Sequence, residues 1–209
     1  MNHDPVSSRH STYESCRQLH RVSLRLLLLL CSVLVPTLSF AQWVQTNGPS
    51  GGVVQNVCVS GTNMFAATGG AGVFLSTDAG ANWKSVNTGL PSLYMDAIFA
   101  SGSTLYVSAW PSTISAGGVF VSANNGTSWT PSGTGLLSNQ VNTFASIGGK
   151  IFAGTSGGGV YISANSGASW SAVNTGLSGS ALTVHSLTVD GTTLIAGTSG
   201  GVFRSTNDG

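Results

Sequence analysis

The feature that most constrains this chain is a repeat of roughly 40 to 50 residues that dominates everything after residue 41. Four segments align without gaps: GVFLSTDAGANW from Gly72, GVFVSANNGTSW from Gly118, GVYISANSGASW from Gly159 and GVFRSTNDG from Gly201. The serines that open the turn in each segment are Ser76, Ser122, Ser163 and Ser205, spaced 46, 41 and 42 residues apart. Such a period is typical of propeller blades built from four short strands. The repeat therefore predicts an all-β propeller.

Each period contains strand-like runs bounded by Gly and Ser, and none shows a sustained helical rhythm. In the third unit, strands are predicted over residues 141–146, 150–154, 159–163 and 170–174, with tight turns between them. We expect four-stranded antiparallel blades, about three complete and one partial.

The turn of the repeat resembles the Asp-box, or BNR, repeat family, whose pattern is Ser-x-Asp-x-Gly-x-x-Trp. STDAGANW at 76–83 matches every fixed position, and the resemblance covers roughly residues 43–209. Asn124, Asn165 and Asn207 replace the aspartate in later copies, but an Asn oxygen can still accept backbone N–H bonds while Gly supplies a positive φ. The resemblance assigns box positions to Ser76, Asp78, Gly80, Trp83, Ser122, Asn124, Gly126, Trp129, Ser163, Asn165, Gly167 and Trp170.

The resemblance implies that these boxes are scaffold. In that family the boxes join the third and fourth strands on the face opposite to the ligand-binding one. The box tryptophan is expected to fold back over the hairpin into the space between neighbouring sheets, where an aromatic ring contributes a large apolar area.

Residues 1–41 have the pattern of a cleaved signal peptide. Four arginines precede the apolar run LLLLLCSVLVPTLSFA, and Ser39-Phe40-Ala41 offers small residues for cleavage after Ala41. A membrane anchor is the competing interpretation, but residues 26–35 provide about half of the roughly 20 apolar residues that span a bilayer. A lipoprotein site at Cys31 lacks small residues before it. We predict export to the periplasm or outside the cell, with cell-surface attachment left open and no stable membrane span after cleavage.

The two ends of the repeat region predict a truncated propeller over residues 42–209. WVQTNG at 43–48 resembles the fourth-strand segments at 83–89 and 170–176, but no first three strands precede it. The sequence stops at Gly209, inside the fourth box and before its Trp position.

The composition argues against several function classes. Charged residues make up only 6%, and no basic stripe for nucleic acid is present. Sialidases share the box but need several arginines and a glutamate, whereas Arg204 is the only arginine after the leader and no glutamate follows it. Most glycosidases need two opposed carboxylates, and Asp96 is the only one outside a predicted turn. We therefore predict no catalytic residues and no enzyme.

No metal or cofactor is predicted either. His185 is the only histidine after the leader, and no Cys or carboxylate cluster accompanies it. Cys58 would be the only cysteine left after cleavage, and its apolar strand pattern indicates a buried hydrophobe rather than a reactive thiol.

Aligning the units on their turn glycines places Gln55, Asp96, Asn142 and His185 in one column of the first strand. In a propeller the first strand lines the central axis, so this column predicts a polar ring near a channel mouth. The ring is either a solvated wall or a surface that contacts a ligand. Trp110, on a loop longer than its equivalents, is a further candidate, although it could equally cap its own blade. Tyr94, in a connector, is another.

These observations favour a non-enzymatic propeller that binds a protein or glycan through loops on one face. One alternative is a fragment of an Asp-box glycoside hydrolase whose catalytic residues lie in missing blades. Another is an assembly factor similar to the Asp-box propellers of photosynthetic complexes, but their arginine-rich surface has no counterpart here.

Overall fold

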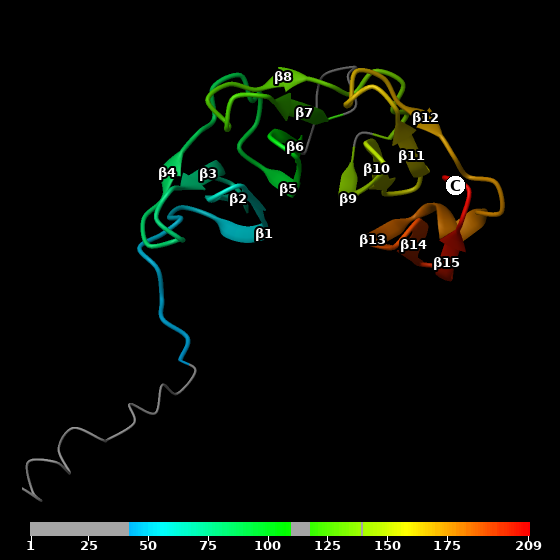
Figure 1. Ribbon diagram of the computed structural model, residues 1–209, viewed down its shortest axis with the longest axis horizontal. Helices are drawn as coiled ribbons and strands as arrows, with labels where there is room; N and C mark the ends of the chain where they lie inside the picture. Colours follow the sequence, from blue (N-terminus) through cyan, green and yellow to red (C-terminus); the bar gives the residue numbers. More distant parts are fainter. Residues whose placement is uncertain (1–41, 110–117, 139) are drawn as a thin grey trace, which may run out of the picture. The chain divides into compact units, whose positions relative to one another are not determined.

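The computed structural model describes residues 42–109, 118–138 and 140–209, and it divides the chain into two compact units, Met1–Val44 and Gln45–Gly209. All strands of the described residues belong to the second unit (Figure 1). They are β1 (Val53–Ser60), β2 (Asn63–Gly69), β3 (Gly72–Ser76), β4 (Lys84–Ser85), β5 (Met95–Ser101), β6 (Thr104–Ala109), β7 (Val119–Ser122), β8 (Thr130–Pro131), β9 (Val141–Ile147), β10 (Lys150–Thr155), β11 (Gly159–Ser163), β12 (Ser171–Ala172), β13 (Val184–Asp190), β14 (Thr193–Thr198) and β15 (Gly201–Ser205).

Each repeat forms its own antiparallel sheet. The strand orders are β1-β2-β3-β4, β5-β6-β7-β8, β9-β10-β11-β12 and β13-β14-β15, and we call these sheets blades A, B, C and D. The predicted all-β propeller of four-stranded blades, three complete and one partial, is confirmed. The outer strands are shorter than predicted, with two residues each in blades A, B and C, because only their first residues pair with the third strand.

The blades follow one another in chain order, with inner strands β1, β5, β9 and β13 side by side (Figure 1). Three apolar clusters fill the junctions A/B, B/C and C/D. The middle strands β6 and β10 are buried along almost their whole length because a neighbouring blade covers each face. Alternating apolar side chains therefore build the core between sheets rather than within one.

The predicted outer strand at 43–48 is not a strand in the structure. Asn47 forms a single parallel bridge to Asn82, and its N–H donates to Ala81 O at 3.2 Å. The connector between blades C and D contains a short 3₁₀ helix, η1 (Gly179–Leu182).

Candidate functional site

Every inner strand carries a β-bulge near its first residue, and the four residues of the predicted polar column occupy these bulges. The pairing register skips Gln55 in β1, Asp96 in β5, Asn142 in β9 and His185 in β13. A bulge leaves one residue out of the ladder and redirects its side chain, and bulges are over-represented next to active sites. Each residue of the polar column is therefore the bulge residue of its blade.

The bulges and the repeat turns lie at opposite ends of each sheet. In blade A the bulged end of β1 faces the end of β2, because Val53 pairs with Gly69. The third strand runs away from that end, and Ser76, which opens the repeat turn, pairs with Met64 at the start of β2. We call these two ends of the sheets the bulge end and the turn end.

Two members of the column bond to a serine that follows the second strand of their blade. Asn142 Nδ2 donates to Ser156 Oγ at 3.0 Å, and that hydroxyl lies 3.3 Å from Asn142 Oδ1. His185 Nε2 lies 2.8 Å from Ser199 Oγ. Sequence reasoning missed both serines. Both serines lie in a Thr-Ser-Gly-Gly run, which we interpreted as a turn, and this run was the only signal in the sequence that could have identified them.

Hydrogen bonds at the bulge end also link neighbouring blades. Asn142 Nδ2 donates to Val184 O at 2.7 Å, from blade C to blade D. Between blades B and C, Ser108 Oγ donates to Val141 O at 2.6 Å and accepts from Ala97 N at 3.2 Å. In both junctions the acceptor is the carbonyl of the residue that precedes the next bulge. A chain of polar contacts therefore runs along the bulge end from blade B to blade D.

Asp96 differs from the other members of this column. Its Oδ2 atom is buried and has no hydrogen-bond partner among the described residues. Ser108, not the bulge residue, makes the bond to the next blade at this junction. Burial raises the pKa of Asp96 above its usual value, because surroundings of low polarity disfavour the charged form. A half-buried carboxyl group with a raised pKa and no evident structural task is a candidate for a functional residue.

Gln55 and Tyr94 both cover the main chain of the turn after β2. A Cβ built on Gly69 would lie 2.9 Å from Gln55 Nε2, and one built on Gly70 would lie 4.0 Å from Tyr94 Cζ. The connector holding Tyr94 is fixed because Leu93 O accepts from Gly70 N at 3.0 Å. Tyr94 is 56% exposed, so an aromatic ring and an amide are both accessible at the bulge end of blade A. Trp110 lies outside the described residues, and its role stays a prediction.

The repeat turns at the turn end are held by their own side chains. Ser76 Oγ donates to Asp78 Oδ1 at 2.8 Å and accepts from Gly80 N at 2.9 Å. The carboxylate also accepts from the side chain and the backbone N–H of Asn82, at 2.8 and 2.9 Å. The bonds from Asn82, then the one from Ser76, lower the pKa of Asp78 to about 2. This carboxylate is therefore engaged within its own turn.

The later turns keep this geometry without a charge. Asn124 Oδ1 accepts from Ser122 Oγ at 2.8 Å and from Ser128 N at 3.0 Å. Asn165 makes the same two bonds, to Ser163 and Ser169, at 2.9 Å each. Because the turn needs only the side-chain oxygen, an amide serves as well as a carboxylate.

The turn tryptophans differ in how deeply they are buried. Trp129 is 3% exposed and its Nε1 donates to Val86 O of blade A at 2.7 Å. Trp170 is 4% exposed and its Nε1 donates to Ser132 O of blade B at 2.6 Å. Both indoles therefore join adjacent blades. Trp83 is only half-buried, and within the described ranges its buried Nε1 has no partner.

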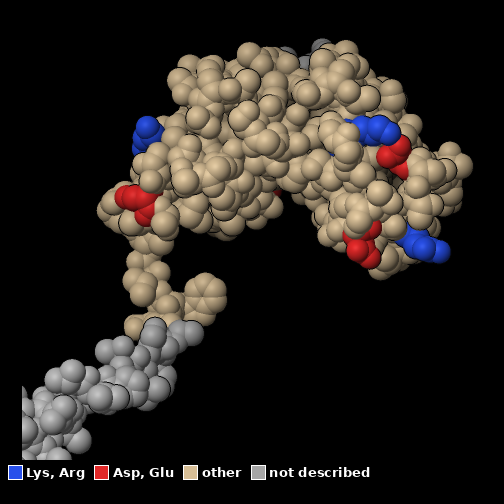
Figure 2. Space-filling view, viewed as in Figure 1, with Lys and Arg blue, Asp and Glu red and all other residues tan. Residues whose placement is uncertain are grey.

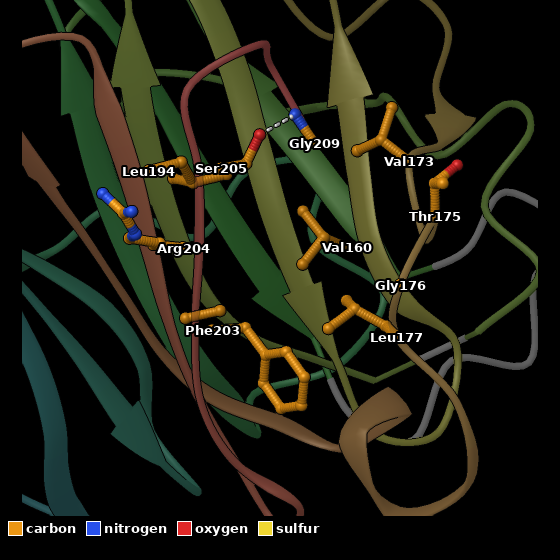
Figure 3. A pocket seen from close by; sticks show the side chains of 11 residues that line it. Val160, Val173, Thr175, Gly176, Leu177, Leu194, Phe203, Arg204, Ser205 and Gly209 are labelled. Carbon is orange, nitrogen blue, oxygen red and sulfur yellow. Dashed lines mark hydrogen bonds between the residues drawn. The ribbon is translucent and has the colours of Figure 1, made fainter.

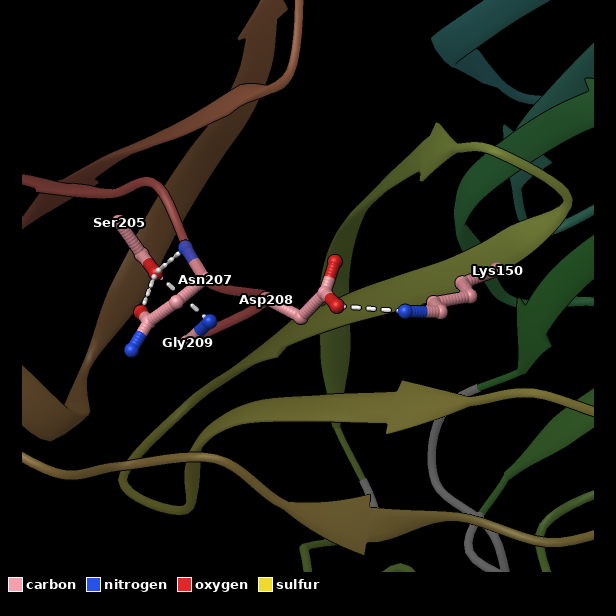
Figure 4. A network of polar contacts seen from close by, with 5 residues as sticks. All are labelled: Lys150, Ser205, Asn207, Asp208 and Gly209. Atoms are coloured by element: carbon pink, nitrogen blue, oxygen red, sulfur yellow. Dashed lines mark hydrogen bonds and ion pairs between the residues drawn. The ribbon is translucent and has the colours of Figure 1, made fainter.

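A pocket of about 160 Å³ lies between blades C and D, and the side chains of Val160, Val173, Leu177 and Phe203 line it (Figure 3). Nearby, Lys150 of blade C forms an ion pair with Asp208 of the fourth turn (Figure 4). The pocket is mostly apolar, and none of the four column residues lines it. It is therefore separate from the polar column.

Other site chemistries find little support in residues 42–109, 118–138 and 140–209. Within them, no three His, Cys, Asp or Glu side chains group as metal ligands, and no helix has the length and hydrophobicity to cross a bilayer. Burial raises the pKa of Cys58 to about 12, so its thiol stays protonated. Charged side chains are sparse on the face shown in Figure 2.

Comparison with known proteins shows the fold. No protein-family model matches the chain, and no curated protein matches it in sequence. Solved structures do match. An ancestral GH74 enzyme aligns with a TM-score of 0.62 at 23% identity, over 82% of this chain and 25% of the enzyme. YCF48 from Cyanidioschyzon merolae aligns with a TM-score of 0.55 at 19% identity, over 79% of this chain and 56% of that one.

A third similar structure is the extracellular domain of a one-component system from B. thetaiotaomicron, with a TM-score of 0.61 and 16% identity over 80% of this chain. The chain spans 22% of that protein and a quarter of the GH74 enzyme. These neighbours are β-propeller proteins, and the chain shares their fold.

Proposed function

We propose that this chain is a secreted or cell-surface, non-enzymatic propeller of the Asp-box type that binds a protein or glycan ligand at its bulge end. The observation that carries the proposal is the buried Oδ2 atom of Asp96, which has no partner among the described residues while Asn142 and His185 are bonded within the fold. Buried polar groups are normally satisfied. An unsatisfied one beside accessible polar side chains favours a ligand site.

The surroundings of Asp96 fit a binding surface. Tyr94 is exposed two residues before it, and exposed aromatic side chains are enriched where proteins contact partners. The turn end offers fewer free charged groups to a ligand, because Asp78 is bonded within its turn and Lys150 is paired with Asp208. The extracellular domain among the structural neighbours and the signal-peptide pattern of residues 1–41 support an exported protein.

The test is a binding screen of the exported chain against a glycan array and a panel of extracellular proteins, followed by variants. Asp96→Asn and Tyr94→Ala should weaken binding at least about tenfold, or 1.4 kcal/mol. Asp190→Asn is the matched control, since Asp190 is an exposed carboxylate at the opposite end of its sheet. Equal affinity for Asp96→Asn and the wild-type chain would place the ligand elsewhere.

A second candidate, favoured by the GH74 enzymes among the neighbours, is that the chain is part of a glycoside hydrolase. Against it, the carboxylates of the described residues that remain after Asp78 and Asp208 are Asp96 and Asp190, which lie at opposite ends of their sheets. Hydrolysis needs two carboxyl groups roughly 5 to 10 Å apart. One of these neighbours is a GH74 xyloglucanase from Xanthomonas campestris. Release of reducing sugar from xyloglucan by the chain would favour the hydrolase over the binding protein.

A further inference from the structure

The charged side chains are divided unevenly between the two ends of the sheets. Those of the described residues lie at the turn end, in a repeat turn or at a strand end beside a turn, with a single exception. The turn-end side chains balance one another in charge and are Lys84, Lys150, Arg204, Asp78, Asp190 and Asp208. The exception is Asp96, in the bulge of β5. Within the described ranges, the bulge end therefore carries one carboxyl group and neither lysine nor arginine to balance it.

A ligand that covers Asp96 has to compensate the charge of this carboxyl group. The group is already half-buried, and its buried Oδ2 atom has no hydrogen-bond partner among the described residues. Covering it removes still more water, which is unfavourable for an ionised group that gains no counter-charge. A cationic ligand offsets this cost by forming a charge pair, whereas a neutral ligand does not. The state of Asp96 therefore favours a cation.

The surrounding elements do not supply the missing positive charge. The strands that pack most closely against β5 are β1, β2, β6 and β9, and their titratable side chains are Cys58 and Tyr106. Burial raises the pKa of both, and neither thiol nor phenol carries a positive charge in any form. His185 is the other titratable member of the polar column, but it lies on β13 of blade D and contacts Ser199. The counter-charge must therefore come from the ligand.

The connectors that enter β5 and β9 expose large apolar side chains at the bulge end. Leu93 and Tyr94, just before β5, are 45% and 56% exposed, and Leu137, before β9, is 89% exposed. Ser138 fixes the second connector at this end, because its hydroxyl donates to Ser156 O at 3.2 Å, just after β10. Covering aliphatic side chains with apolar groups is favourable. A protein segment offers such groups, whereas a glycan offers mainly hydroxyls.

We propose that the ligand is a protein, and that one of its lysine or arginine side chains binds at Asp96 while neighbouring apolar side chains contact Leu93 and Leu137. The inference rests on the proposed function and names the class of its ligand. An ionised carboxyl group only accepts hydrogen bonds, and the basic side chain supplies both N–H donors and the opposite charge. Asp190 offers no equivalent site, because it is exposed and therefore hydrated.

Protonation of Asp96 separates a basic protein segment from a neutral glycan. Burial raises the pKa of this carboxyl group. A cationic ligand loses its counter-charge when the group is protonated, so its affinity should be complete above this pKa and fall as the pH decreases through it. A neutral glycan loses no charge pair, and its affinity should stay level or rise. The Asp96→Asn variant should lack the dependence, and any that remains belongs to His185.

The first experiment uses two small probes and NMR of the exported chain. N-acetyl-arginine methylamide represents the cation, and methyl β-glucoside represents the neutral sugar. We expect the arginine derivative to shift the signal of the Asp96 carboxyl carbon and to lower the pH midpoint of its titration. The carboxyl carbon of Asp190 is the control within the same spectrum and should respond much less. The glucoside should leave both signals unchanged.

The second experiment tests the apolar contacts with the labelled peptides GSLRLSG, GSLKLSG and GSLQLSG and fluorescence anisotropy. The two basic peptides should bind at least about tenfold more tightly than the neutral one, as expected for a charge pair that loses water. Asp96→Asn should abolish this difference, and Asp190→Asn should preserve it. Leu137→Ala should weaken all three peptides by a similar factor. Circular dichroism checks that the variants fold.

The outcomes distinguish this inference from the proposed function on which it rests. An Asp96 signal that ignores the arginine derivative, or a preference for basic peptides that survives Asp96→Asn, would overturn the inference. If a neutral glycan instead binds in an Asp96-dependent way, the proposed function remains and only the ligand class is wrong. If no ligand of any class depends on Asp96, both fail.

Discussion

Replacing Trp129 by alanine tests whether the turn tryptophans hold the blades together. The side chain is 3% exposed and packs in the apolar cluster between blades A and B. Deleting a buried aromatic side chain costs about 3–5 kcal/mol. The lost indole N–H also leaves Val86 O without this donor, which adds about 1 kcal/mol. We therefore expect a loss of about 4–6 kcal/mol from the free energy of unfolding.

Trp83→Ala is the matched comparison. Its indole is half-buried and makes no hydrogen bond to the described residues, so we expect roughly half the loss, about 2–3 kcal/mol. Trp129→Phe keeps a ring but removes the donor, and should cost about 1–2 kcal/mol.

Urea unfolding followed by circular dichroism measures all three variants, provided that the m-value stays constant. The Trp129→Ala loss corresponds to a fall in Tm of roughly 10 °C or more for a chain of this size. Equal losses for Trp83→Ala and Trp129→Ala, or a loss below about 1 kcal/mol for Trp129→Ala, would refute the packing argument.

Three further changes follow from the same contacts. Gly135→Ala should cost at least about 2 kcal/mol more than Gly176→Ala, because both glycines have φ near +90° but only the first would collide with Trp170 O; thermal melting compares them. The lowered pKa of Asp78 contributes stability that is present above 3.8 and lost as pH falls toward about 2; Asp78→Asn should lack this acid dependence in unfolding titrations. Ser108→Ala leaves the Val141 carbonyl without its donor and should cost about 1–2 kcal/mol in urea unfolding.

The blades were predictable because the sequence repeats their determinants. A period near 40 residues, Gly at positive φ and a Ser that caps each turn recur in every unit, and local chemistry decides such features. The segment at 43–48 was mispredicted as a strand for the opposite reason. Its sequence matches the outer strands, but a strand also needs a partner strand beside it, and in the structure this segment forms only the single bridge from Asn47 to Asn82.

The polar column was also predictable, since alignment alone brings Gln55, Asp96, Asn142 and His185 together. The β-bulge at each of these residues was not predictable, because one extra residue in a strand does not change the short pattern of polar and apolar residues in a distinctive way. Burial of the turn tryptophans was predicted alike for all copies. Trp83 is less buried than Trp129 and Trp170, because the burial of each indole depends on the apolar cluster that it shares with a neighbouring blade, and the described clusters contain only the latter two.

The differences between equivalent blades indicate how one scaffold can release a residue for binding. In blade C the bulge residue Asn142 makes the bond to the next blade. In blade B that bond comes from Ser108, at a position where blade C has Gly154. Because the Ser108 hydroxyl on the second strand makes the bond to the next blade, the bulge residue of blade B does not have to make it. A carboxylate, which cannot donate this bond, is therefore tolerated at the bulge. A position without a structural task can carry a functional side chain at some cost in stability. We propose that Asp96 is such a side chain.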